Sequence, residues 1–269
     1  LQSIVLKHNN SENIFTQVLE YDKLGRMSAI KTDTFTKRYT YLKSGDHASN
    51  LVSMLQFGVN NLNSDTFTYK YDEKGNITEI HNLNVLIARY KYDGLSRIVR
   101  EDNNELKKTF TFFYDAGGNI VSKNEYSFTL VDNLETQSPT NTLKYTYPLS
   151  GWKDQLMEFN GEKFEYDILG NPVVYRNKTL EWSHGRQLDK FSNLATFTYN
   201  ANGIRMSKFA NGFTTQYFLN GTKILRQKDA SNDLTFYYGV DGITGFHITS
   251  TNATYNNENL DHDFYYKKN

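Results

Sequence analysis

The sequence predicts an all-β protein, and three observations carry that prediction. Aromatic residues are abundant, with 20 Tyr and 18 Phe among 269 residues, and such residues suit the pleated surface of a sheet. Aromatic and polar residues alternate along many short stretches, as in Phe67, Tyr69 and Tyr71 with Thr and Lys between them. One short turn motif also recurs along the chain. Because period-two alternation places the aromatic groups on one face of each strand, we expect antiparallel hairpins.

The recurring motif is Tyr-Asp-x-x-Gly followed by Asn or Arg. Four nearly complete copies contain Tyr21, Asp22 and Gly25; Tyr71, Asp72 and Gly75; Tyr114, Asp115 and Gly118; and Tyr166, Asp167 and Gly170. Two partial copies contain Tyr92 and Asp93, and Tyr199 and Gly203. Weaker copies begin near residues 41, 147, 182, 217 and 238. Because no separate domain interrupts this series, residues 1–269 are predicted to form a single repeat segment.

Each copy of the motif is predicted to close a β-hairpin. An Asp side chain accepts hydrogen bonds from backbone amides two residues further on, and Gly takes the positive φ that returns the chain to the ladder. The spacing of Asp and Gly therefore predicts a type I turn followed by a Gly bulge. Ser96 stands where the other copies have Gly. We expect a distorted turn there, at a cost of about 1 kcal/mol.

Two longer intervals between copies of the motif are predicted to be loops or insertions. They are residues 50–65 and 127–141. The second contains turn and breaker signals such as Asp132, Asn133 and Pro139. Residues 48–54 are predicted to form a short helical turn.

Composition excludes several classes of partner and fold. The 30 Lys and Arg balance the 30 Asp and Glu, so no surface for nucleic acid or an anionic membrane is predicted. The longest apolar stretches fall far short of the roughly 18 residues of a membrane span. The mean hydropathy of −0.66 and the Tyr-rich face disfavour a two-sheet sandwich. A single-layer sheet with cross-strand aromatic ladders is predicted instead.

Residues with catalytic chemistry are not grouped into a recognisable site. The sequence contains no nucleophile elbow and no phosphate-cradling loop. The repeated Asp residues share one context, so each is interpreted as satisfying its own turn. Asp261, His262 and Asp263 are interpreted as a polar loop, because no second His lies at the spacing of a metal ligand. We therefore predict that the chain is not an enzyme and holds no catalytic residue, metal or cofactor.

The repeated motif resembles that of the Rhs/YD-repeat family, which includes bacterial Rhs toxins, wall-associated proteins, the C component of Tc toxins and the teneurin YD shell. The resemblance covers about residues 15–245. It implies a continuous, curved and spiralling antiparallel sheet of hairpins that forms part of a hollow β-shell. In the bacterial toxins of this family, the shell holds a C-terminal toxin domain.

Two parts of the family's pattern have no counterpart in this sequence. The Asp-Pro-x-Gly signature and the self-cleaving aspartates of the C-terminal core are absent, and so is a variable toxin domain. The sequence also begins at Leu1, without an initiator Met. We therefore expect a segment of a larger gene product, to which the family's self-cleavage and toxicity are not carried over.

The resemblance predicts a non-catalytic, encapsulating part of a secreted or cell-surface bacterial toxin, with its own C-terminal toxin as partner. The alternative is a surface adhesion or carbohydrate-binding module that binds glycans or a cell-surface receptor. For that alternative, Trp152 and Trp182 are the candidates for stacking on sugar rings. A segment cut from a larger sheet also has open edges, so edge-to-edge self-association of the chain is predicted.

Overall fold

The structure is a computed structural model that describes residues 2–8, 11–32, 35–44, 47–59, 62–239, 242–255 and 258–265. Every regular element among these residues is a β-strand, so the all-β prediction is confirmed. None of the described residues belongs to a helix that is long and apolar enough to cross a bilayer.

The chain divides into two compact units, residues 1–144 and residues 145–269. The first unit contains β1 (Gln2–His8), β2 (Ser11–Tyr21), β3 (Met27–Lys31), β4 (Phe35–Ser44), β5 (His47–Val59), β6 (Leu62–Tyr71), β7 (Ile77–Asn82), β8 (Val85–Tyr92), β9 (Ile98–Asn103), β10 (Lys108–Tyr114), β11 (Ile120–Ser127) and most of β12 (Asn141–Thr146). The second unit contains the end of β12, then β13 (Glu158–Phe159), β14 (Glu162–Tyr166), β15 (Pro172–Tyr175), β16 (Lys178–Ser183), β17 (Gln187–Phe191), β18 (Ala195–Tyr199), β19 (Arg205–Ala210), β20 (Phe213–Asn220), β21 (Lys223–Lys228), β22 (Asn232–Gly239), β23 (Gly242–Tyr255) and β24 (Glu258–Tyr265).

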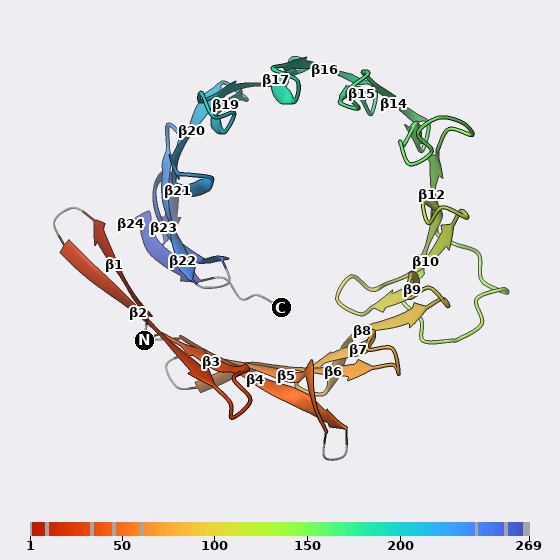
Figure 1. The fold of residues 1–269 in the computed structure, drawn as a ribbon, viewed down its shortest axis with the longest axis horizontal. Helices are drawn as coiled ribbons and strands as arrows, with labels where there is room; N and C mark the ends of the chain where they lie inside the picture. The colour runs from red at the N-terminus through yellow and green to blue at the C-terminus, as the bar shows by residue number, and fades with distance from the viewer. Residues whose placement is uncertain are drawn as a thin grey trace. The chain divides into compact units, whose positions relative to one another are not determined.

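Each strand pairs antiparallel with the strand that follows it in the chain. In the first unit this series extends from β1–β2 to β11–β12. In the second unit it extends from β12–β13 to β23–β24. Within each unit the strands follow one another in chain order along a curved path (Figure 1). The prediction of a curved antiparallel sheet made from successive hairpins is confirmed within each unit.

The sheet of the first unit has two chemically different faces. Residues directly opposite each other on neighbouring strands point to the same side. Leu55 lies opposite Phe67, and Tyr69 lies opposite Ile80, so these residues mark one side, which we call the aromatic face. The residues between them, such as Thr66, mark the opposite side, which we call the polar face.

The best-buried cluster lies on the aromatic face. Leu55, Phe57 and Phe67 are 4%, 1% and 6% exposed. The ring centroid of Phe57 lies 6.0 Å from those of Phe35 and Phe67 on the neighbouring strands. Further partly buried residues pack around this cluster: Phe35, Tyr39, Val52, Tyr69 and Ile80. A single sheet therefore gains a core from side chains that lie next to one another across adjacent strands.

Two local predictions for the first unit are wrong, and a third is confirmed. Residues 48–54 form no helical turn, and residues 50–65 are not a loop, because β5 and β6 occupy this region up to Val59 and from Leu62. Leu55 and Phe57 explain the difference, since both pair with strands on each side and are buried there. The interval 128–140 contains no strand, as predicted for an insertion.

Candidate functional site

Six turns share one backbone geometry, and we call them the signature turns: residues 21–26, 71–76, 92–97, 114–119, 166–171 and 199–204. In each, the amide of the fifth residue donates to the carbonyl oxygen of the second at 2.9–3.2 Å. The amide of the second residue donates to the carbonyl oxygen of the sixth at 2.8–3.0 Å. The fifth-position glycines have φ of 75–94°, and the register shifts at the aromatic residue. This is the geometry of a type I turn with a Gly bulge.

The side chain of the second residue organises each signature turn. Oδ1 of Asp72 accepts the backbone amides of Lys74 and Asn76 at 2.9 and 2.8 Å, and Oδ2 accepts the side-chain amide of Asn76 at 2.8 Å. Asp115 and Asp167 accept the same three hydrogen bonds within their own turns. Asp22 and Asp93 do so too, but there the side-chain donor to Oδ2 is an Arg instead of an Asn. In the last signature turn, Oδ1 of Asn200 accepts both backbone amides. Each of these side chains is therefore engaged by its own turn.

Ser96 corrects one expectation about these turns. Its φ of 62° lies in the left-handed region, and its amide donates to the carbonyl oxygen of Asp93 at 3.1 Å, as Gly does in the other copies. The expected distortion of the turn is therefore wrong, because Ser96 adopts the strained φ instead. The side-chain amide of Asn76 donates to the Ser96 hydroxyl oxygen at 3.1 Å. This contact between successive turns offsets part of the strain.

The stability of the signature turns is expected to fall in acid. The side-chain amide of the following Asn, together with the turn's backbone amides, lowers the pKa of Asp72, Asp115 and Asp167 below the usual 3.8. Because the unfolded chain then binds protons more readily, the contribution of these carboxylates is complete above about pH 5 and is lost as the pH falls through the lowered pKa. Urea denaturation at decreasing pH below about 5 should therefore show a falling midpoint.

The matched control replaces the three aspartates by Asn, as in Asp72→Asn, Asp115→Asn and Asp167→Asn. Asn200 shows that an amide oxygen accepts both backbone amides of such a turn. The triple variant should be less stable than the parent at neutral pH and should show a flatter loss of stability in acid. An equally steep loss in both proteins would contradict the assignment to these carboxylates.

In eight repeats, the aromatic residue at the start of the repeat makes a contact that sequence reasoning missed. Its side-chain donor reaches a backbone carbonyl oxygen 10–19 residues earlier, in the preceding repeat, at 2.6–2.9 Å. We call this hydrogen bond the inter-repeat bridge. The bridges among the described residues are Tyr41 to Met27, Tyr71 to Val52, Tyr92 to Ile77, Tyr114 to Ile98, Tyr166 to Leu156, Trp182 to Pro172, Tyr199 to Leu188 and Tyr238 to Ile224.

The position of the acceptor explains why the bridges recur. Ile77 is the strand partner of Tyr71, and Ile98 is the strand partner of Tyr92, in each case where the register shifts. The hydroxyl of Tyr92 therefore binds the residue paired with Tyr71, and that of Tyr114 binds the residue paired with Tyr92. Because a bulge interrupts the backbone ladder, the side chain of the next repeat supplies a donor at that point.

The sequence did contain a signal for these bridges. The residue before Asp or Asn is Tyr in all six signature turns, whereas the residue two positions earlier is Leu, Phe or Tyr. A position that needs only an apolar surface accepts all three residue types. A position that must donate a hydrogen bond accepts Tyr and not Phe.

Arginine at the sixth position adds a second contact between repeats. The guanidinium of Arg26 lies 4.1 Å from the ring centroid of Tyr41. In the same way, the guanidinium of Arg97 lies 4.5 Å from the ring centroid of Tyr114. The same two guanidinium groups pair with Asp22 and Asp93 in their own turns. Each Arg therefore connects the carboxylate of one repeat with the bridging ring of the next.

The two tryptophans proposed for sugar stacking lie beside the same signature turn. Trp182 is half-buried, and its indole Nε1 donates to the carbonyl oxygen of Pro172 at 2.7 Å, so it takes the place of the bridging Tyr. Trp152 is 60% exposed, and its ring lies against Gly170. Of the two, Trp152 has the ring face that a ligand can reach.

Replacement of Gly170 by Ala is expected to cost more than replacement of a comparable Gly in open space. Both Gly170 and Gly212 have φ near +80°, where Ala carries a strain of about 1–2 kcal/mol. A Cβ at Gly170 would also lie 2.9 Å from the Trp152 ring, whereas Gly212 has no atom within 4 Å of that position. Urea denaturation followed by Trp fluorescence should show a larger loss for Gly170→Ala than for Gly212→Ala. Equal losses would mean that the Trp152 ring moves aside freely.

The weaker copies of the motif differ from one another in strand pairing and register. Tyr41 pairs with Val52, and its hairpin tip at residues 45–46 lies outside the described residues. Tyr147 begins an irregular segment between β12 and β13. Tyr217 lies within β20, and the register shift between Phe218 and Leu219 comes two residues later than in the signature turns. At Tyr238 the register shifts at the aromatic residue, as in the signature turns, but residues 240–241 lie outside the described residues.

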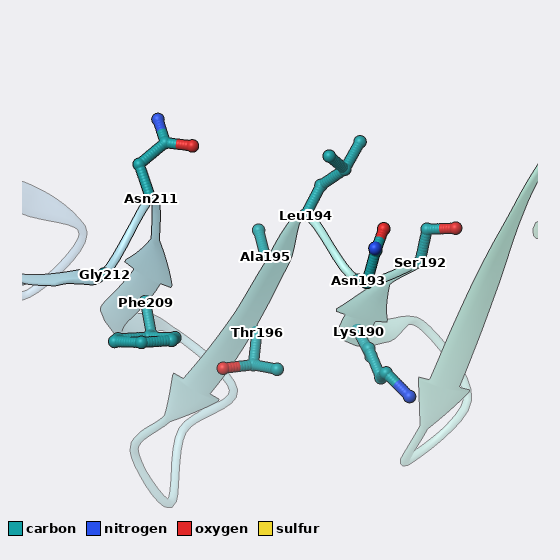
Figure 2. A pocket seen from close by; sticks show the side chains of 9 residues that line it. All are labelled: Lys190, Ser192, Asn193, Leu194, Ala195, Thr196, Phe209, Asn211 and Gly212. Atoms are coloured by element: carbon teal, nitrogen blue, oxygen red, sulfur yellow. The ribbon is translucent and has the colours of Figure 1, made fainter.

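A depression of about 280 Å³ lies beside two hairpin tips of the second unit (Figure 2). Lys190, Thr196 and Phe209 come from three neighbouring strands and point to one side, while Leu194 and Asn211 at the tips point the other way. The Phe209 ring is 48% exposed. The wall of the depression also contains Ser192, Asn193, Ala195 and Gly212. The depression thus combines one reachable aromatic ring with hydroxyl and side-chain amide groups.

Among the described residues, no group of three or more His, Asp or Glu side chains is placed to hold a metal ion. Asp261 lies 3.0 Å from Nε2 of His247 on the neighbouring strand. The side chains of His262 and Asp263 lie outside the described residues.

No protein-family model matches the chain. The tRNA3(Ser)-specific nuclease WapA of Bacillus spizizenii is 28% identical over 178 residues, which cover 61% of this chain and 6% of that protein. The crystal structure of TcdB2-TccC3-Cdc42 matches 99% of this chain and 15% of its own, with a TM-score of 0.62 and 13% identity. The crystal structure of TcdB2-TccC3 matches 97% of this chain and 14% of its own, with a TM-score of 0.51 and 13% identity.

The two structural matches show that the chain shares the β-sheet fold of a chain in the TcdB2-TccC3 structures. The chain spans only a small part of the length of the proteins that it matches.

Proposed function

We propose that this chain is a non-catalytic segment of a β-shell in a larger secreted or cell-surface bacterial toxin of the Rhs/YD-repeat type. In the intact parent, the shell encloses a C-terminal toxin. The inter-repeat bridge is the observation that carries the proposal, because it recurs at eight junctions between successive repeats among the described residues. A construction in which every unit repeats the same contacts with its neighbour extends to any length, as a shell wall requires.

The chemistry of the repeated aspartates supports a structural role. Both oxygens of Asp72 and Asp115 accept hydrogen bonds from within their own turns. A general acid or base needs an oxygen available to a substrate, and a set of identical turns offers no distinct pair of groups with separate tasks. The likeness in fold to a Tc toxin chain and the sequence similarity to a nuclease toxin support the same assignment.

Protease protection of the intact parent protein tests enclosure. The C-terminal segment should resist digestion while the wall is intact, and it should be cut when the wall is weakened by a core substitution such as Phe57→Ala. Equal cleavage of the C-terminal segment in both proteins would show that the wall does not enclose it. Recombinant C-terminal segment alone serves as the control for its intrinsic sensitivity.

Carbohydrate binding is the second candidate, and the exposed Phe209 ring favours it. A sugar stacks its apolar face on an aromatic ring, while the Thr196 hydroxyl and the Lys190 amine, which point to the same side as Phe209, bind its hydroxyl groups. A glycan array probed with the parent chain, Phe209→Ala and Trp152→Ala tests this function. Loss of a signal in one variant would locate the site, and the absence of any signal from the parent chain would exclude this candidate.

Edge-to-edge association of the isolated chain is a further part of the proposal, because strands that lack a neighbour expose unpaired amides and carbonyl groups. Light scattering across a range of concentrations should show a mass that rises with concentration. A constant monomer mass would contradict it.

A further inference from the structure

A crossing segment lies over the polar face of the first unit. β11 ends at Ser127, and residues 128–132 pass back over β10, β9 and β8 before the chain returns to begin β12. The amide of Phe128 donates to the carbonyl oxygen of Lys107 at 3.1 Å, and that of Thr140 donates to the carbonyl oxygen of Glu125 at 2.7 Å. Both ends of the insertion are therefore tied to the sheet. We call residues 128–132 the strap.

A buried carboxylate lies at the centre of the covered area. Asp102 is 0% exposed, and Arg100 is 4% exposed. Oδ1 of Asp102 accepts hydrogen bonds from Nε of Arg100 at 2.7 Å and from the Thr109 hydroxyl at 2.9 Å. Oδ2 accepts a hydrogen bond from Nε of Arg89 at 2.7 Å. One negative charge thus holds two guanidinium groups in place, and the remaining donors of these groups need other acceptors.

The strap supplies those acceptors from its backbone. Arg100 donates to the carbonyl oxygens of Thr129, Val131 and Asp132 at 2.9, 2.8 and 3.0 Å. Arg89 donates to the carbonyl oxygen of Leu130 at 2.9 Å. Four successive carbonyl groups therefore bind the two arginines, and the Asp132 carboxylate also lies 3.6 Å from an Nη atom of Arg89. The backbone amide of Thr129 in turn donates to the hydroxyl of Thr109, and Lys91 pairs with the Asp132 carboxylate at 2.8 Å.

These contacts differ in range from those between neighbouring repeats. The inter-repeat bridges connect residues 10–19 apart, whereas the contacts of Arg89 and Arg100 with the strap connect residues 29–41 apart. The strap is bound to β8, β9 and β10 at the same time.

We propose that the strap, Asp102 and the two arginines form a charge-dependent clasp that makes β8, β9 and β10 open as one cooperative unit. The polar face between these strands stays closed until the strap is released. Removal of the central negative charge leaves Arg100 without a carboxylate partner among the described residues and leaves Arg89 with only the Asp132 carboxylate at 3.6 Å, so the clasp depends on Asp102. This inference concerns local opening, and it holds whether or not the parent protein encloses a toxin.

Hydrogen–deuterium exchange of the full chain tests the clasp with Asp102→Asn. Exchange at Thr129 and Val131 and along β9 and β10 should accelerate together by about tenfold or more, because a buried charged hydrogen-bond network is lost. Exchange in residues 71–76 should stay within about twofold of the rate in the unsubstituted chain, since that turn makes none of these contacts. Glu105→Gln is the matched control: it removes one negative charge from an exposed position in the hairpin tip next to the clasp and should leave every rate unchanged.

Two results would overturn the proposal. Unchanged exchange of the strap in Asp102→Asn would show that Asp102 does not hold it. Faster exchange of the strap alone, with β9 and β10 as slow as in the parent, would show that the strap does not bind the strands into one unit. If Asp102→Asn does not fold, Thr109→Val tests the same inference, because it removes the hydroxyl that joins Asp102 to the amide of Thr129 and keeps the side-chain volume.

Discussion

Replacement of Phe57 by Ala is expected to lower the free energy of unfolding by about 3–5 kcal/mol, as for other fully buried rings. Phe57 is 1% exposed, and its ring packs against Phe35 and Phe67 on the two neighbouring strands. A single-layer sheet has no second layer that could collapse into the resulting cavity. Urea denaturation of the full chain, followed by circular dichroism, should show that residues 1–144 unfold at a lower urea concentration.

Phe113→Ala is the control for this substitution. Phe113 lies on β10 and is 50% exposed, so its removal should cost less than about 1 kcal/mol. A loss of similar size for both variants would mean that the cluster around Phe57 is no more important than any other ring on the sheet. Phe57→Leu should be intermediate, because it keeps most of the apolar contact.

The double variant Tyr71→Phe with Tyr92→Phe is expected to lower the free energy of unfolding by about 2 kcal/mol, or about 1 kcal/mol for each hydrogen bond. Each substitution removes one hydroxyl and leaves the ring in place. The carbonyl oxygens of Val52 and Ile77 then lose their side-chain donors at 2.6 Å. Denaturation with urea measures the total loss, and hydrogen exchange shows whether it is confined to the repeats concerned.

The same strands provide a matched control for this double variant. Tyr69 and Tyr90 lie two residues before Tyr71 and Tyr92, and their hydroxyls make no hydrogen bond among the described residues. The corresponding residue of β10 is already Phe112. Tyr69→Phe with Tyr90→Phe should therefore be close to neutral. A larger loss in this control than in the bridging pair would contradict the importance of the inter-repeat bridge.

The bridges also explain how a sheet of short hairpins remains one structure. An isolated two-stranded hairpin is marginal in water, so each repeat depends on its neighbours. The turn of each repeat is stabilised within itself by residues such as Asp72, whereas the bridge from Tyr92 connects that turn with the next. Stability in such a chain is expected to be close to a sum over repeats and the contacts between neighbours.

The sequence by itself determined the hairpin turns of this protein. In the turn from Tyr71 to Asn76, all of the hydrogen bonds that shape the backbone lie within six consecutive residues. Contacts of such short range depend on residue type and spacing alone, so Asp-x-x-Gly predicted the turn, its bulge and the order of the strands. Ser96 is the exception to this agreement. Its residue type predicted a distorted turn, whereas its backbone adopts a positive φ, as the glycines of the other turns do.

Only the tertiary structure decided the contacts between distant residues. Leu55 and Phe57 belong to a strand and not to a loop because rings from two neighbouring strands bury them. Trp182 has the place of a bridging Tyr because its indole group reaches Pro172. The strap binds Arg89 and Arg100 mainly through backbone carbonyl groups, which every residue carries. Apart from the charge of Asp132, the side-chain sequence of the strap therefore contains no sign of that contact. Such contacts depend on which strands lie side by side, and that arrangement exists only after the chain has folded.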